Sequence, residues 1–103
     1  MNNKIGEVTY KGERLNIFKS TYKNERDAIY LMSEGVLFAT LTINLISEDL
    51  EEGEFFVMNW SENEKIAPWV LEHTDLFEDT GVTVETGFVQ SPVWRFKKGV
   101  ENA

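Results

Sequence analysis

The sequence predicts an α+β fold in which one short helix, at about residues 62–73, packs on a strongly bent antiparallel sheet or a partly closed β-barrel of short, hairpin-connected strands. Three observations support this expectation. Isolated glycines stand at turn positions, a period of two runs through residues 36–45, and a helical apolar spacing occurs in residues 66–73. Many short strands with a single helical segment are typical of an α+β layout.

Length and composition are those of one folded domain. The 103 residues are enough for a single core, and 42% of them are hydrophobic, which argues against disorder. Cysteine is absent, so packing must stabilise the fold, and thiolate metal sites and cysteine nucleophiles are excluded. We expect one domain over residues 1–103, with frayed tails at residues 1–3 and 98–103.

Two hairpins are expected in the first half of the chain. Residues 5–10 and 13–22 form the first, and residues 28–32 and 36–45 form the second, joined across Ser33-Glu34-Gly35. Between residues 36 and 45 the odd positions are apolar and the even positions are largely polar, as in a half-buried strand. The side chains expected to face the core are Leu37, Ala39, Leu41, Ile43 and Leu45.

The second half begins with a strand at residues 55–58, whose apolar and aromatic character places it centrally in a sheet. Ser61 and Glu64 then form a capping-box pattern at the start of the helix. Pro68 lacks the N–H that would bond the Glu64 carbonyl, so the helix is kinked or begins nearer Ala67. The helix presents one stripe to the core, made of Ile66, Trp69, Val70 and His73. Short strands are expected at residues 76–77, 82–84, 88–89 and 93–96.

Acidic residues are concentrated in the middle of the chain. Thirteen of the eighteen lie between Leu31 and Ser91, where Lys65 is the only basic residue, so this segment carries about −12. The net charge of −8 repels phosphates, and we therefore expect no direct binding to nucleic acid or to anionic lipid. The N-terminus lacks an apolar signal region, and the longest apolar run, residues 36–39, is far below the roughly 20 residues of a membrane span. A cytoplasmic location is expected.

The acidic run Glu48 to Glu54 does not match a calcium-binding loop. With Glu48 at the first ligand position, Leu50 falls at the third, and Asn59 falls where a bidentate glutamate is needed. A solvated connection between two strands is the better interpretation. His73 is the single histidine, and no glycine-rich phosphate loop occurs. The sequence therefore predicts no metal, no cofactor and no catalytic residue.

Two interaction hypotheses remain. An acidic surface can imitate nucleic acid, but a domain of this length spans roughly 30 Å, and duplex DNA of that span carries on the order of 18 phosphates, more than the central segment supplies. An ordinary solubilising surface is the alternative interpretation of the same acids. Trp60, Trp94 or Tyr30 would form a second docking patch, for a partner or for a second copy, if they were exposed.

Three blocks of sequence carry a family resemblance: residues 39–45 (ATLTINL), residues 59–64 (NWSENE), and residues 79–81 (DTG) with 86–89 (TGFV) and 92–93 (PV). They resemble a small uncharacterised family, a domain of unknown function encoded on plasmids, integrative elements and phages of Gram-positive bacteria. The resemblance covers residues 28–96 and implies no activity, ligand or catalytic residue. It does imply an association with plasmid or phage maintenance, or with blocking a host defence enzyme. Pro68 and Ile46 depart from the family pattern.

These observations favour a non-enzymatic accessory protein of a mobile element that acts by protein–protein contact, with DNA mimicry or inhibition of a host factor as specific forms. The expected partner is a protein, for example a basic nucleic-acid-binding protein, and self-association is a further option. The candidate interaction surface joins the acidic run to the corner between strand and helix: Glu48, Asp49, Glu51, Glu52, Glu54, Asn59, Trp60, Glu62 and Asn63. The alternative is a small enzyme or ligand-binding domain with a carboxylate-lined pocket near Glu62 and Glu64.

Overall fold

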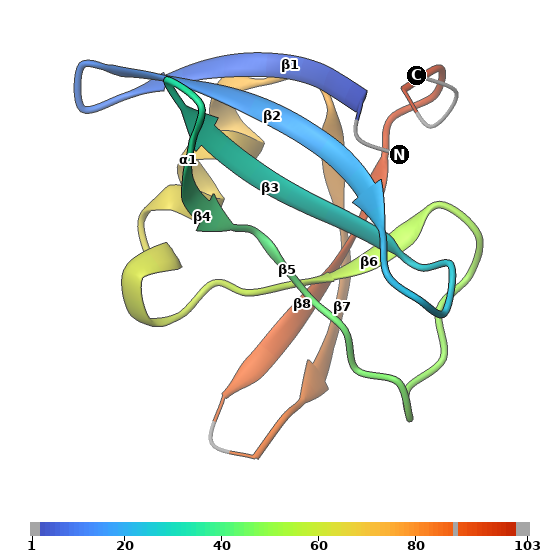
Figure 1. Ribbon diagram of the computed structural model, residues 1–103. Helices are drawn as coiled ribbons and strands as arrows, with labels where there is room; N and C mark the ends of the chain where they lie inside the picture. The colour runs from blue at the N-terminus through green and yellow to red at the C-terminus, as the bar shows by residue number, and fades with distance from the viewer. Residues whose placement is uncertain (1–2, 88, 101–103) are drawn as a thin grey trace.

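Two four-stranded antiparallel sheets and one short helix form the fold in the computed structural model, which describes residues 3–87 and 89–100 (Figure 1). The first sheet has the order β1-β2-β3-β4, with β1 Asn3–Tyr10, β2 Glu13–Thr21, β3 Asp27–Ser33 and β4 Val36–Thr40. The second has the order β5-β6-β8-β7, with β5 Thr42–Ile43, β6 Glu54–Val57, β7 Phe77–Glu85 and β8 Gln90–Phe96. A 3₁₀ turn, η1 Ser61–Asn63, and the helix α1 Ile66–His73 connect β6 to β7. The architecture agrees with the α+β class, but the sheets do not close into a barrel, so that part of the prediction was wrong.

Tight turns with positive φ close two of the three hairpins of the first sheet, β1-β2 and β3-β4. Lys11-Gly12 and Glu34-Gly35 have φ values of 49°, 81°, 50° and 81°, the pattern of type I′ turns, whose twist matches that of the flanking strands. Tyr10 pairs with Glu13 across the first turn, and Ser33 pairs with Val36 across the second. Both hairpins predicted from the glycines are therefore confirmed.

The strand predicted over residues 36–45 is interrupted at Leu41, where the chain leaves one sheet and enters the other. The Leu41 N–H donates to the Ile29 carbonyl in β3 (2.9 Å), whereas the Leu41 carbonyl accepts the N–H of Met58, just beyond β6 (2.8 Å). Thr42 reinforces this corner because its Oγ1 accepts the Ile29 N–H (3.1 Å). One residue thus links two sheets that otherwise have separate ladders.

A register shift between β3 and β4 reverses the predicted direction of Leu37. Leu31 pairs with Ala39 and Met32 pairs with Leu37, which leaves Phe38 as an extra, bulged residue. Ala39 and Leu41 are buried as predicted, but Leu37 is 57% exposed. The prediction for Leu37 was wrong because one inserted residue in a strand of period two moves the preceding side chains to the other face.

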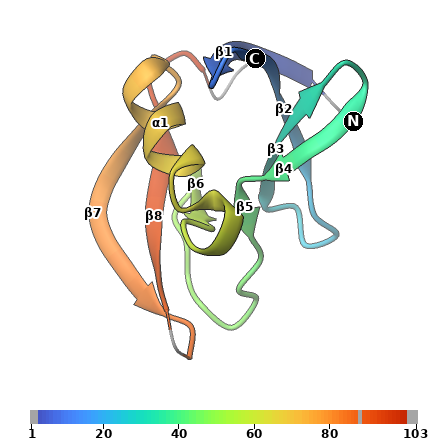
Figure 2. The same ribbon diagram turned by 90° about the vertical axis from the view of Figure 1, so that its left-hand side faces the viewer.

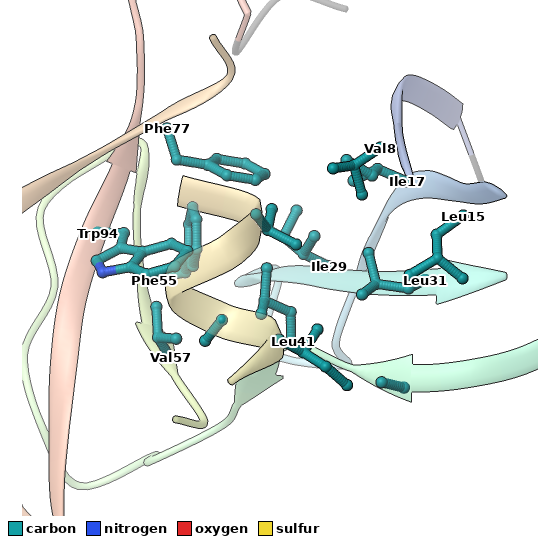
Figure 3. Close-up of a cluster of buried hydrophobic side chains, with 14 of the residues drawn as sticks. Val8, Leu15, Ile17, Ile29, Leu31, Leu41, Phe55, Val57, Phe77 and Trp94 are labelled. Carbon is teal, nitrogen blue, oxygen red and sulfur yellow. The ribbon is translucent and has the colours of Figure 1, made fainter. Parts of the chain in front are cut away.

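The core lies between the sheets, which face each other with α1 at one end (Figure 2). In Figure 3, aliphatic side chains of the first sheet, such as Val8 and Ile17, lie opposite an aromatic group of the second. The Phe55 ring centroid is 5.4 Å from that of Phe77 and 6.4 Å from that of Trp94. The inner position of β6 is as predicted, and Trp94, only 2% exposed, belongs to the core and not to a docking patch.

The helix predicted over residues 62–73 is divided into η1 and α1. Ser61 has a φ of +58°, not the extended backbone of an N-cap, and η1 has no side-chain cap hydrogen bond. The predicted capping box was therefore wrong. Pro68 is the third residue of α1 and lies in the first turn, where N–H groups have no intrahelical partner. The helix therefore begins close to Ala67, as the position of Pro68 predicted.

The remaining strands are longer than expected. β7 joins the segments predicted at 76–77 and 82–84 into one strand that is irregular between Asp79 and Thr83, and β8 begins before residue 93. Of the strand predicted at 88–89, Phe88 lies outside the described residues and Val89 lies in the turn before β8. Asn3 pairs with Lys19 in the first sheet, and the rest of the predicted N-terminal tail lies outside the described residues.

At the other end of the chain, Val100 packs against the core, and residues 101–103 of the predicted tail are not among the described residues. Within the described part of the chain, neither helical segment has the length and apolar character needed to cross a membrane.

Candidate functional site

The structure divides the nine candidate residues between the two ends of β6. The acidic run leads into β6, and the strand-to-helix corner, residues 59–63, follows it. β6 has four residues, about 13 Å of extended chain. The candidate interaction surface predicted from the sequence is therefore divided into two separate parts.

At the corner, Asn63 has a structural role. It is 1% exposed, and its Nδ2 donates to the carbonyls of Thr40 (2.7 Å) and Met58 (3.0 Å). These contacts tie η1 to the ends of β4 and β6. Asn59 and Trp60 are half-buried, so Glu62 is the one candidate at this corner that is exposed.

The acid loop, which we define as residues 44–53 between β5 and β6, is held by an arginine from a distant part of the chain. Arg26 donates from Nη1 to the Leu45 carbonyl (2.7 Å) and from Nη2 to the Glu48 carbonyl. Its guanidinium carbon lies 5.8 Å from the ring centroid of Phe56. A planar guanidinium can bond two carbonyls at once, which an ammonium group does less well. Arg26 therefore fixes the course of the acid loop.

The end of the acid loop forms a tight turn into β6. The Glu54 N–H donates to the Glu51 carbonyl (3.1 Å), and Oε1 of Glu54 accepts the Glu51 N–H (3.0 Å). Gly53, at a φ of +84°, completes the turn. The Glu54 carboxylate thus accepts a hydrogen bond from the backbone of the acid loop, whereas Glu51 and Glu52 are exposed.

This turn forms one wall of a groove of about 700 Å³, which we call the acid groove. The opposite wall comes from the connection before β3 and from the strands that flank it. Five carboxylates and three cations line it: Glu25, Asp27, Glu51, Glu52 and Glu54, with Lys19, Arg26 and Arg95; Leu50, Gly53 and Phe96 complete the lining. Sequence reasoning identified the residues of the loop but missed Glu25 and Asp27, because no pattern links residues 25–27 to residues 51–54.

Burial and local charge set the electrostatics of the acid groove. Asp27 is half-buried, and this desolvation raises the pKa of its carboxyl, an effect that the positive charge of Lys19 partly offsets. Arg95 donates to Oε1 of Glu78, and this hydrogen bond, with smaller contributions from Glu54 and Glu51, raises the pKa of Arg95. The cations of the groove are thus engaged by the protein itself, and exposed carboxylates face the solvent.

His73 and Trp69 have structural roles at the helix α1. The His73 ring stacks on Trp69 at a centroid distance of 3.8 Å, and its Nδ1 lies 3.0 Å from the Trp69 carbonyl. Trp69 in turn donates from Nε1 to the Thr9 carbonyl (2.8 Å), so this group fastens α1 to β1. In residues 3–87 and 89–100, no three or more His, Asp or Glu side chains are grouped so that they could hold a metal ion.

Comparison with family models, curated proteins and solved structures found no match to this chain.

Proposed function

We propose that this protein is a non-enzymatic accessory protein that binds a basic protein through the acid groove. The observation that carries the proposal is the convergence of carboxylates from two distant segments, Glu25 with Asp27 and Glu51 with Glu52, on one groove. Arg26 maintains this convergence because it bonds the backbone of the acid loop.

The chemistry of the acid groove suits lysine and arginine side chains of a partner. Each exposed ion pair contributes only about 0.2–1 kcal/mol, so useful affinity requires several pairs formed together. Three exposed carboxylates within one groove, those of Glu25, Glu51 and Glu52, meet this requirement. The excess of negative charge would also accelerate encounter with a basic surface, and added salt would weaken that effect.

The charge balance favours a protein surface of mixed charge over DNA mimicry as the mode of action. Against the five carboxylates stand Lys19, Arg26 and Arg95, so the groove carries a net charge of about −2. Duplex DNA presents one negative charge per roughly 1.7 Å, a much denser array. We propose a cytoplasmic basic protein as the partner, with inhibition of a host factor as the outcome. The resemblance to proteins of mobile elements in Gram-positive bacteria directs the search for that partner to such hosts.

A pull-down with matched charge variants tests the proposal. Tagged wild-type protein is incubated with an extract of a Gram-positive host at low and at high ionic strength. The groove variant is E51Q/E52Q, and the control, E72Q/E85Q, makes the same change of net charge at exposed positions of α1 and β7. We expect a basic protein that is retained at low salt, is released at high salt, and binds the groove variant about tenfold more weakly than the wild type. Equal retention by the two variants would contradict a role of the acid groove.

A further inference from the structure

The outer edge of the first sheet carries an apolar patch. β4 is the last strand of its sheet (Figure 2), and we define the β4 patch as Val36, Leu37 and Phe38, which are 67%, 57% and 37% exposed. Edge strands usually carry charged groups, inward-pointing groups or a bulge, which discourage pairing with another chain. β4 has a bulge at Phe38, but it also has three consecutive exposed apolar residues and no charged one.

The register of the hairpin leaves backbone groups of β4 available. Ser33 and Val36 close a two-residue turn, and such a closing pair exchanges both of its hydrogen bonds. The next residue, Leu37, therefore directs its N–H and C=O away from β3. Farther along, the Thr40 carbonyl already accepts a hydrogen bond from Asn63, so the available edge ends there. This edge is a template for one added strand.

Carboxylates bracket the β4 patch at both ends. At the turn, Glu34 is exposed, and the carboxylate of Glu13 accepts a hydrogen bond from the Ser33 hydroxyl beside it. At the other end, the contact of Asn63 with Thr40 brings η1 against β4, which places the exposed Glu62 and Glu64 there. An added strand would meet negative charge at each of its ends.

This arrangement disfavours a second copy as the occupant. In antiparallel pairing, the turn end of one β4 would lie beside the η1 end of the other, and in parallel pairing like ends would meet. Both arrangements bring carboxylates together between chains that each carry a net charge of −8. Like charges placed opposite each other destabilise strand pairing.

We propose that the β4 edge binds an extended segment of a partner protein that has a short apolar stretch with lysine or arginine at both ends. The backbone of the segment would pair with β4, its apolar side chains would cover the β4 patch, and its basic ends would meet the two pairs of glutamates. This contact is separate from the acid groove, because the β4 patch pairs with Met32 and Ser33, about 17–20 Å along β3 from Asp27, and the other end of the β4 edge, at Thr40, pairs with Tyr30, about 10 Å from Asp27. Binding at the β4 edge does not depend on binding at the acid groove.

Titration of the isotope-labelled full chain, followed by amide NMR shifts, tests the proposal. The probe is the synthetic peptide Lys-Lys-Val-Thr-Val-Thr-Val-Lys-Lys, and the comparison peptide has glutamate in place of every lysine. We expect the lysine peptide to shift the amides of β4 and η1, and to bind at least about tenfold more tightly than the glutamate peptide at low salt. Equal affinity of the two peptides, or shifts confined to the acid groove, would overturn the proposal. Concentration-dependent shifts of β4 without any peptide would show that a second copy is the occupant, and would overturn it as well.

Substitutions in the β4 patch and in the glutamates beside it test where the lysine peptide binds. V36S/L37S removes exposed apolar surface from β4, and V82S is the control at another site, because Val82 is 54% exposed on β7, an edge strand of the second sheet. We expect the β4 variant to lose about tenfold in affinity for the lysine peptide and the control to lose none. E34Q/E62Q keeps the apolar patch and should also weaken binding, which gives a second readout if the serine variant unfolds. Binding that is unchanged in E34Q/E62Q would refute the charge recognition.

Discussion

At the scale of single residues, turn conformation offers a direct test of the fold. Lys11 has a φ of 49° in the turn between β1 and β2, a conformation that asparagine and glycine adopt more readily than lysine. We expect K11N to raise the free energy of unfolding by up to about 0.5 kcal/mol, and Gly12→Ala to lower it by about 1 kcal/mol because Gly12 has a φ of 81°. Urea denaturation measures both changes. If both substitutions changed the free energy of unfolding in the same direction, that result would contradict the type I′ turn.

Ion pairs at the surface predict a dependence on pH. A hydrogen bond from Nζ of Lys97 to Oδ1 of Asp75 (2.9 Å) lowers the pKa of the Asp75 carboxyl below its ordinary value of 3.8. The pair therefore contributes stability above that value and loses it as the pH falls through the lower pKa of the folded state. In Lys97→Met we expect the pKa of Asp75 to rise toward its ordinary value in an NMR titration. An unchanged pKa would show that the pair does not form in solution.

Because Asp27 is half-buried, its contribution to stability depends on pH in the opposite direction to that of Asp75. Its pKa is raised in the folded state, so its charged form is disfavoured there, and protonation as the pH falls through the raised pKa relieves that cost. Acid would thus weaken the Asp75 pair while it relieves the desolvation cost of the half-buried Asp27 carboxyl.

At the scale of elements, the acid loop depends on Arg26. We expect Arg26→Met to leave an apolar side chain near Phe56 but to remove the guanidinium that contacts its ring and bonds the carbonyls of Leu45 and Glu48, at a cost of about 1–3 kcal/mol. Hydrogen–deuterium exchange should then rise in residues 44–53. Arg14→Met is the control, because Arg14 is exposed on β2 and forms an ion pair with Glu7 of β1. Equal exchange in the acid loop of both variants would show that Arg26 does not hold it.

Element prediction from the sequence succeeded where the local signal was strong. The glycines at positions 12 and 35 located two hairpins because type I′ turns need positive φ. It failed where tertiary structure overrode a local pattern. Leu37 turned outward because of the bulge at Phe38, and Ser61 could not cap the helix because its φ is positive. Neither event has a signature in the neighbouring residues.

At the scale of the whole molecule, the acid groove could be predicted only in part. The cluster of acids from Glu48 to Glu54 was evident in the sequence, but its second wall, with Glu25 and Asp27, is brought to it by folding of the two sheets and by Arg26. The sequence also suggested one surface from the acidic run to residue 63, whereas β6 separates the two parts. Charge alone indicated a kind of partner, and only the fold brings the carboxylates that we propose to bind it together in one groove.

Hydrogen–deuterium exchange of the complex formed with the partner captured at low salt gives the sharpest test of whether the acid groove contacts a basic protein. We expect slower exchange in the complex than in the free protein at the amides of residues 25–27 and 50–54, which line the groove. We also expect the groove variant E51Q/E52Q to show this protection only at higher partner concentration. If the amides of residues 25–27 and 50–54 exchange in the complex as they do in the free protein, the acid groove is not the binding site.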